Sequence, residues 1–159
     1  MIKENFSNFI DNLQKDITSS LEIIDGKEKF KSEHWNREKG GGLTMVIENG
    51  NVFEKGGVNV SKVHGQLPDS MSKMLKATNS EFFACGISIV IHPKNPMVPT
   101  FHANLRYFEL YEKDELKDSW FGGGLDLTPY YLFENDVIHF DKAWKHTCDN
   151  YSSQFSVVY

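Results

Sequence analysis

The sequence has 159 residues, which favours a single domain, and 40% of them are hydrophobic, enough for a packed core. Its net charge of −5 argues against a non-specific nucleic-acid-binding protein, because such proteins need a basic surface. Two cysteines, Cys85 and Cys148, stand far apart and outside any CxxC pair, so a reducing compartment is indicated. The first residues include acids and no segment has membrane-spanning length, so the predicted location is the cytoplasm.

The first half of the chain predicts a helix followed by extended segments. Apolar residues recur at spacings of three and four from Phe6 to Leu21, which indicates an amphipathic helix. Asn49 and Gly50 lie between two apolar runs, a pattern typical of a β-hairpin. Extended chain is expected over 56–65, and a short helix over 69–78.

The second half predicts two strands and a second helix. The strands are expected over 82–92 and 100–111, joined by a loop whose three prolines exclude helix. A glycine-rich turn is expected at 122–124, and an amphipathic helix over 140–151. Strands in the middle with helices at the flanks predict an α+β fold, a large antiparallel sheet covered by helices.

The strand over 100–111 has two faces of opposite character. Alternate residues of a strand share a face, so His102, Asn104 and Arg106 lie together, and an apolar row lies behind them. In the strand before it, small and polar residues such as Ser88 and His92 also share one face. If the two strands are neighbours, these side chains form one polar floor with room above it. The alternative is a face that simply meets solvent, as antiparallel sheets often show.

The residue types on this predicted floor suit an acidic small molecule. Arginine captures carboxylates or phosphates through paired hydrogen bonds, and His102 suits proton transfer near neutral pH. Asp126 follows the glycine run, whose backbone can approach a bulky partner closely. The alternative for this segment is a tight turn with a solvated aspartate.

Two other chemistries are weaker matches to the residues. His139 and Asp141 have the HxD spacing of non-haem iron oxygenases, but apart from His146 the other histidines lie upstream rather than downstream. Ser88, His102 and Asp126 suggest a hydrolytic triad, but Ser88 lies inside a strand and no GxSxG motif is present.

Three long blocks occur in a fixed order in this chain. They are FEKGGVNVSKVHG, GISIVIHPKNPMVPTFHANLRYFEL and WFGGGLDLTPYY. Together they resemble the signature blocks of oxygen-dependent coproporphyrinogen III oxidase, over most of residues 30–150. The resemblance implies a large antiparallel sheet flanked by helices, usually in a homodimer. It implies the oxidative decarboxylation of two propionates of coproporphyrinogen III to vinyls, which gives protoporphyrinogen IX in haem biosynthesis. O2 would be the oxidant, with no organic cofactor.

The resemblance also assigns roles to residues of this chain. His102 matches a proton donor, and Asp126 matches an acid that faces the pyrrole nitrogens of the macrocycle. Four positions match substrate contacts: Ser88, Asn104, Leu105 and Arg106. Three histidines match members of a divalent-metal set described in bacterial relatives: His92, His102 and His139.

The chain also departs from the family pattern. The family's chains are longer, and their later part carries further substrate segments, a last histidine of the metal set and much of the dimer contact. Ser119 stands where the family usually has a second tryptophan, and SSQFSVVY, residues 152–159, looks unlike a natural ending. Residues 1–159 are therefore expected to be the N-terminal portion of a longer domain. Two hypotheses follow: an oxidase, or a catalytically inactive remnant that at most binds porphyrin or a partner chain.

Overall fold

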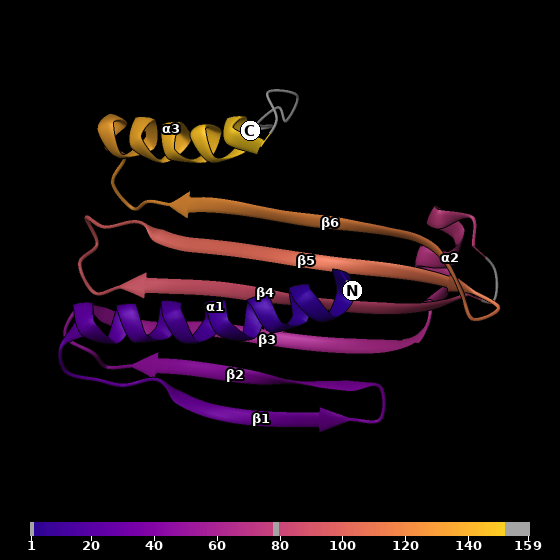
Figure 1. The fold of residues 1–159 in the computed structure, drawn as a ribbon. Coiled ribbons are helices and arrows are strands. Elements are labelled where there is room, and N and C mark those ends of the chain that lie inside the picture. The colour runs from indigo at the N-terminus through magenta and orange to yellow at the C-terminus, as the bar shows by residue number, and fades with distance from the viewer. Residues whose placement is uncertain (1, 78–79, 152–159) are drawn as a thin grey trace.

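The computed structural model describes residues 2–77 and 80–151, which form an antiparallel sheet with helices around it (Figure 1). The strands lie in the sheet in the order in which they follow in the chain, each antiparallel to the next. They are β1 (Lys31–Arg37), β2 (Gly40–Glu48), β3 (Phe53–Gln66), β4 (Glu81–Pro93), β5 (Thr100–Glu112) and β6 (Glu115–Thr128). The helices are α1 (Ile2–Asp25), α2 (Asp69–Leu75) and α3 (Glu134–Tyr151). The predicted α+β fold is confirmed.

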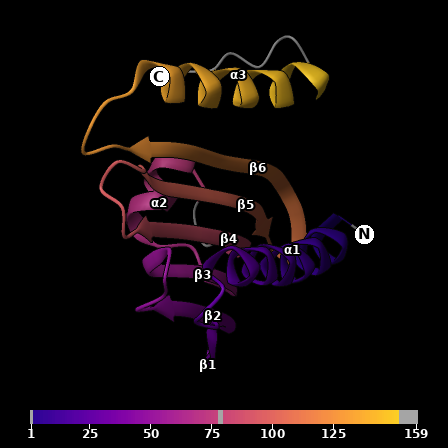
Figure 2. The ribbon, with the colours of Figure 1, turned by 90° about the vertical axis from the view of Figure 1, so that its left-hand side faces the viewer.

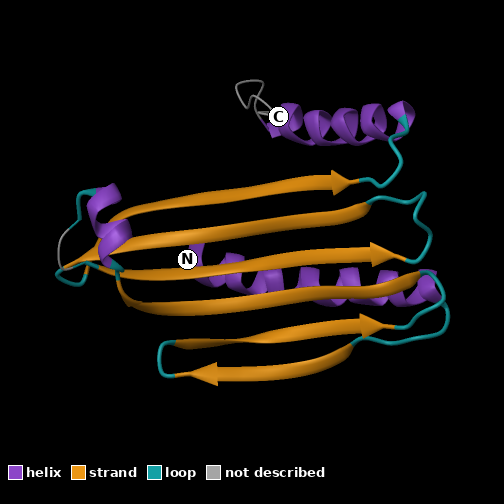
Figure 3. Cartoon of the chain, turned by 180° about the vertical axis from the view of Figure 1, so that it is seen from behind, coloured by secondary structure: helices purple, strands orange, loops and turns teal. Residues whose placement is uncertain are grey.

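Helix α1 covers one face of the sheet, as its apolar stripe predicts (Figures 1 and 3). Ile10 is completely buried, and the core beneath it consists of alternate residues of the central strands. Gln14 is buried at the same interface, where its Nε2 donates to the carbonyls of Leu43 at 2.9 Å and Val58 at 2.7 Å. One amide therefore ties the helix to two neighbouring strands.

The C-terminal end of α1 is fastened to the loop between β2 and β3. The carboxylate of Asp25 accepts hydrogen bonds from the backbone N–H groups of Asn51, Val52 and Phe53, and from those of Lys27 and Glu28. The predicted hairpin is confirmed, but its loop spans residues 49–52, and a side chain at residue 50 would overlap the Asp25 carboxylate.

Two features of the strands differ from the sequence-based prediction. The expected glycine-rich turn at 122–124 is wrong, because these glycines lie inside β6 and pair with β5. The chain turns instead at Lys113 and Asp114, which both have positive φ angles, of 50° and 65°. Strand β1 was not predicted, because its charged and polar residues leave little apolar alternation.

The other two helices do not lie on the sheet face that α1 covers. Helix α2 lies against the opposite face at one end of the sheet, over Phe82, Phe108 and Leu110 (Figures 2 and 3). Helix α3 lies alongside β6 (Figure 1), and three residues of its predicted stripe, Phe140, Trp144 and Cys148, are half-buried. In the part of the chain that the structure describes, no helix is both long and apolar enough to cross a membrane. Residues 152–159 lie outside the described residues.

Candidate functional site

The register of the sheet joins the predicted polar residues into one surface. Residues that pair directly across antiparallel strands share a face. Ser88 pairs with Asn104, and Asn104 with Gly124, while Arg106 lies between Gly86 and Gly122. The expectation that the two strands are neighbours is thus confirmed. We call this surface the polar floor; it is formed by the sheet face opposite α1.

Leu105 is the exception among the predicted site residues. Its side chain packs against the core under α1, on the face opposite the polar floor. The apolar row behind the floor, which includes Ala103 and Tyr107, packs there as expected. Only the backbone of Leu105 can therefore reach a ligand on the floor.

His102 and Asp126 form a pair on neighbouring strands. They are direct cross-strand partners, with His102 Nδ1 3.2 Å from Asp126 Oδ1. The other carboxylate oxygen accepts a hydrogen bond from the hydroxyl of Thr128 at 3.1 Å. A carboxylate at Nδ1 fixes the orientation of an imidazole ring, so Nε2 is the atom of His102 that can exchange a proton with a ligand. The Asp126 side chain remains 59% exposed, so its further lone pairs are accessible to a ligand.

Thr128 was missed by the sequence reasoning. It lies two residues after Asp126 on the same strand face, so the period of two would have found it once β6 was identified. Ser88, by contrast, has no described hydrogen bond to His102, so the pair is not extended into the serine triad considered above. The described residues thus form a carboxylate–histidine pair rather than a hydrolytic triad.

The predicted metal ligands are only partly brought together. The rings of His92 and His102 are 6.4 Å apart between centroids and perpendicular to each other. His139 is exposed on α3, and Asp141 is half-buried on the same helix. Residues two apart on a helix do not face each other, so the HxD pair does not converge. No group of three or more His, Cys, Asp or Glu side chains in the described residues could hold a metal ion. We therefore derive no step through a metal.

The glycines of β6 leave the floor bare near the histidine–aspartate pair. A Cβ atom built on Gly122 or Gly124 would meet no atom within 4 Å, so nothing in this chain fills the space above them. A Cβ on Gly123, whose side faces α1, would lie 2.6 Å from the Asn104 carbonyl oxygen. The sheet itself requires glycine at 123, whereas the space above 122 and 124 is available to a ligand.

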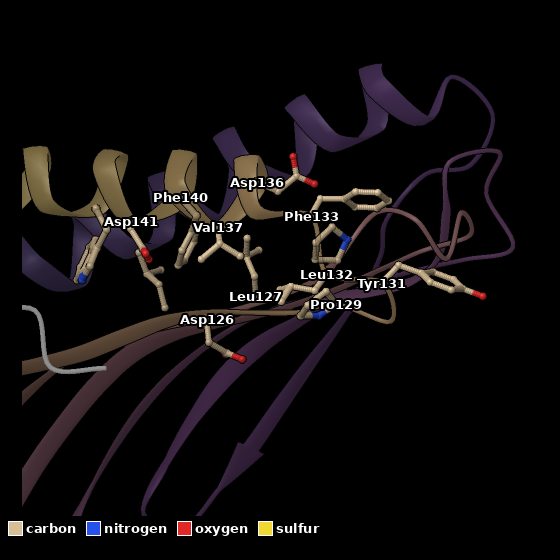
Figure 4. Close-up of a pocket in the computed structure, with 13 residues that line it drawn as sticks. Asp126, Leu127, Pro129, Tyr131, Leu132, Phe133, Asp136, Val137, Phe140 and Asp141 are labelled. Atoms are coloured by element: carbon tan, nitrogen blue, oxygen red, sulfur yellow. The ribbon is translucent and has the colours of Figure 1, made fainter.

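A separate pocket of about 410 Å³ lies between β6 and α3 (Figure 4). Its walls are mainly apolar and include Leu127, Val137 and Phe140. Asp126 borders it, but Figure 4 shows this side chain on the side of β6 away from the helix. The charged chemistry of the floor and this apolar pocket are thus on different sides of β6.

Beneath the floor, the α1 side holds a buried acid. Glu109 accepts hydrogen bonds from the hydroxyls of Tyr107 and Tyr111, and Lys3 Nζ lies 3.8 Å from it. The hydrogen bond to Glu109, followed by burial, raises the pKa of Tyr111 to about 12. This cluster belongs to the core, and nothing in it reaches the floor.

This chain is similar to coproporphyrinogen III oxidases over nearly its whole length. The family model described as coproporphyrinogen III oxidase matches residues 5–159. The oxygen-dependent coproporphyrinogen-III oxidase of Prochlorococcus marinus (strain MIT 9515) is 46% identical over 160 residues, which cover 99% of this chain and 45% of that protein. The chloroplastic coproporphyrinogen-III oxidase 1 of Arabidopsis thaliana is 42% identical, over 97% of this chain and 43% of that protein. The mitochondrial human enzyme is 45% identical, over 87% of this chain and 33% of that protein. The chain thus spans less than half the length of these curated relatives, and it belongs to the coproporphyrinogen III oxidase family.

Proposed function

We propose that this chain provides part of the active site for the oxidative decarboxylation of two propionates of coproporphyrinogen III, which gives protoporphyrinogen IX. The observation that carries the proposal is the polar floor. It combines a histidine–carboxylate pair, an arginine four residues further along β5 and open space over two glycines on one sheet face. Family membership makes this the chemistry that such a floor supports best.

The reaction balances with O2 as the only oxidant. In each reacting propionate one C–H bond and the bond to the carboxyl carbon break, a carbon–carbon double bond forms, and CO2 leaves. Each propionate gives up two electrons and one proton. Two propionates therefore supply four electrons, which reduce one O2 to two waters together with two further protons from the medium. This scheme requires no organic cofactor.

The floor residues suit the steps of this reaction. Arg106 can hold a propionate through charge-assisted hydrogen bonds. Asp126 can accept hydrogen bonds from pyrrole N–H groups and stabilise positive charge that develops on the oxidised pyrrole. His102, oriented by Asp126, can transfer a proton through Nε2. Ser88 and Asn104 supply further polar groups between these sites, and the backbone of Leu105 completes the row.

The proposal extends to assembly and location. We propose a homodimer for the longer domain of which this chain is the N-terminal portion, as the family resemblance indicates, and a cytoplasmic protein, as the two free cysteines, Cys85 and Cys148, indicate. Sedimentation velocity of the full-length protein measures the first, and the location of the tagged protein in its own cell measures the second. A full-length monomer or an organelle location would contradict the respective part.

The experiment incubates the purified chain with coproporphyrinogen III in air and measures product masses, with His102→Ala as the matched variant. Loss of two carboxyl groups with the parent chain and none with His102→Ala would support the proposal and show that this part of the active site is sufficient for the reaction. Equal product from both would contradict the role of His102. Porphyrin binding without product would favour the alternative, a chain that binds the macrocycle but needs further segments for catalysis.

A further inference from the structure

A small hollow lies on the polar floor, apart from the histidine–aspartate pair. It has a volume of about 180 Å³, and its lining includes Ser61, Gly86, Ser88 and Arg106. Ser61 of β3 pairs directly with Gly86 of β4, and Gly86 pairs directly with Arg106 of β5. Ser61 and Arg106 therefore stand on either side of a residue that has no side chain. We call this feature the Gly86 hollow.

The side chain of Arg106 leans across Gly86. A Cβ atom built on Gly86 would lie 2.9 Å from Arg106 Cγ and 2.6 Å from the Leu105 carbonyl oxygen. Cross-strand Cβ atoms normally stand about 4.5–5.5 Å apart, so the arginine stem approaches β4 more closely than a side chain there would allow. Glycine at 86 thus leaves room for the Arg106 stem over β4, and Ser61 and Arg106 line the same hollow.

The Gly86 hollow contains donors and no acid. Its polar side chains are two hydroxyls and one guanidinium, and no aspartate or glutamate lines it. Among the described residues, Arg106 has no ion-pair partner, and the side chains of Ser61 and Ser88 make no hydrogen bond. A guanidinium fork between two hydroxyls matches the planar, acceptor-only carboxylate group.

We propose that Ser61 is a carboxylate ligand, which with Ser88 and Arg106 anchors one propionate of the substrate in the Gly86 hollow. This inference rests on the proposed function for the identity of the ligand. Arg106 and His102 are four residues apart on β5, which corresponds to about 13 Å of strand. The anchored propionate is therefore not the one that reacts beside His102. Ser61 positions the macrocycle from its far side.

The first measurement is a titration of the chain with propionate, followed through the NMR signals of the backbone amides. Ser61→Ala removes the hydroxyl, and Ser61→Thr keeps it on a residue that strands favour. Ser32→Ala on exposed β1 is the matched control. We expect saturable shifts at Ser61, Gly86 and Ser88 in the parent chain, in Ser61→Thr and in Ser32→Ala. Ser61→Ala should weaken propionate binding about tenfold, the effect of losing one charge-assisted hydrogen bond.

The second measurement is the affinity for coproporphyrin III, by fluorescence, in the same four proteins. The same order of affinities supports the inference. Absence of saturable shifts at the Gly86 hollow in the parent chain would overturn the inference, irrespective of coproporphyrin III affinity. Unchanged binding of either propionate or coproporphyrin III by Ser61→Ala would overturn it as well. Propionate binding at the hollow without coproporphyrin binding would leave the carboxylate site standing and contradict the proposed substrate. The two proposals can therefore fail separately.

Discussion

Glycine has two different roles in β6, and the difference can be measured residue by residue. At Gly123 a side chain would collide with the backbone of β5, whereas at Gly124 it would project into open space on the polar floor. A glycine in a strand interior weakens the strand because it costs backbone entropy and packs no side chain. No contact within the described residues requires glycine at 124. We therefore explain this glycine by a ligand that lies above it on the polar floor.

Alanine at these two positions should separate folding from binding. We expect Gly124→Ala to leave the free energy of unfolding unchanged or to raise it by up to about 1 kcal/mol, while coproporphyrin III binds more weakly. Gly123→Ala should lower the free energy of unfolding by about 1–3 kcal/mol, because the backbone must shift. Urea denaturation and fluorescence titration give the two quantities. If Gly124→Ala bound the porphyrin as tightly as the parent chain, the ligand would not lie over that glycine.

The buried acid of the core gives a prediction at alkaline pH. The hydrogen bond to Glu109, together with burial, raises the pKa of Tyr111 from its usual value near 10 to about 12. A raised folded-state pKa means that this contribution to stability is fully present below pH 10 and is lost as the pH rises toward 12. We expect Glu109→Gln to lower the pKa of Tyr111, as measured by tyrosinate absorbance. Tyr111→Phe serves to identify the signal, and an unchanged titration in Glu109→Gln would contradict the assignment.

Individual residues also show which parts of the candidate site could not be predicted from the sequence. The period of two in one strand was enough to align His102, Asn104 and Arg106. Ser61 and Asp126 become neighbours of these residues only through the pairing of β3 and β6 with the central strands. The β3–β4 register depends on the connection that contains α2, and the β5–β6 register on the turn at Lys113 and Asp114, where the sequence has no glycine. The polar floor was predictable in part, and the Gly86 hollow was not.

At the scale of elements, the junction of α1 with the β2–β3 loop orients the helix over the sheet. Hydrogen bonds from the backbone N–H groups of Glu28, Phe53, Val52 and Asn51 hold the pKa of Asp25 well below its usual range, although burial acts in the opposite direction. One carboxylate thus links the end of α1 to the β2–β3 loop and the first residue of β3.

This junction should be sensitive to acid. A lowered folded-state pKa means that the contribution of Asp25 to stability is complete above its unfolded value near 3.8, and it is lost as the pH falls below that value. We expect Asp25→Asn to unfold at lower urea concentration at pH 7 and to lose less stability than the parent chain on acidification. The difference between the two urea midpoints, followed from pH 5 to pH 2, measures this. A difference in urea midpoint that stays constant with pH would show that the charge of Asp25 does not stabilise the junction.

The helices and strands differ in how strongly the sequence predicts them. Helix α1 and strands β4 and β5 were predicted because apolar residues recur at the periods of helix and strand over long stretches. Strand β1 was missed because Trp35 is its only large apolar residue. The β5–β6 turn was missed because Lys113 and Asp114 take the left-handed conformation without a glycine, while three glycines nearby suggested a turn elsewhere.

At the scale of the whole molecule, the sheet has two unpaired edges of different character. Strand β1 is charged and short, as protected edges usually are. Strand β6 has 14 residues, no strand on its outer side in the described residues, and exposed Leu116, Trp120 and Phe121. Long apolar edges pair readily with other strands, so β6 is the more reactive edge of the sheet.

Hydrogen exchange should follow this arrangement. We expect the amides of β4 to exchange slowest, because this strand is paired on both sides and buried under α1. In β6 alternate amides should exchange fast, since every second N–H points away from β5. Measurements at several protein concentrations separate the monomer from an assembly. Uniformly slow exchange along β6, increasing in protection with concentration, would mean that a second copy covers this edge.

The order of the strands also bears on how the chain folds during synthesis. Every strand pairs only with the strand made just before or just after it, so the contacts of the sheet have low sequence separation. Each hairpin can close as soon as it leaves the ribosome, and α1 is already available to cover β3 and β4 when they pair. His102, Arg106 and Ser61 are therefore aligned before α3 is synthesised, and residues that follow would meet a preformed surface rather than help to build it.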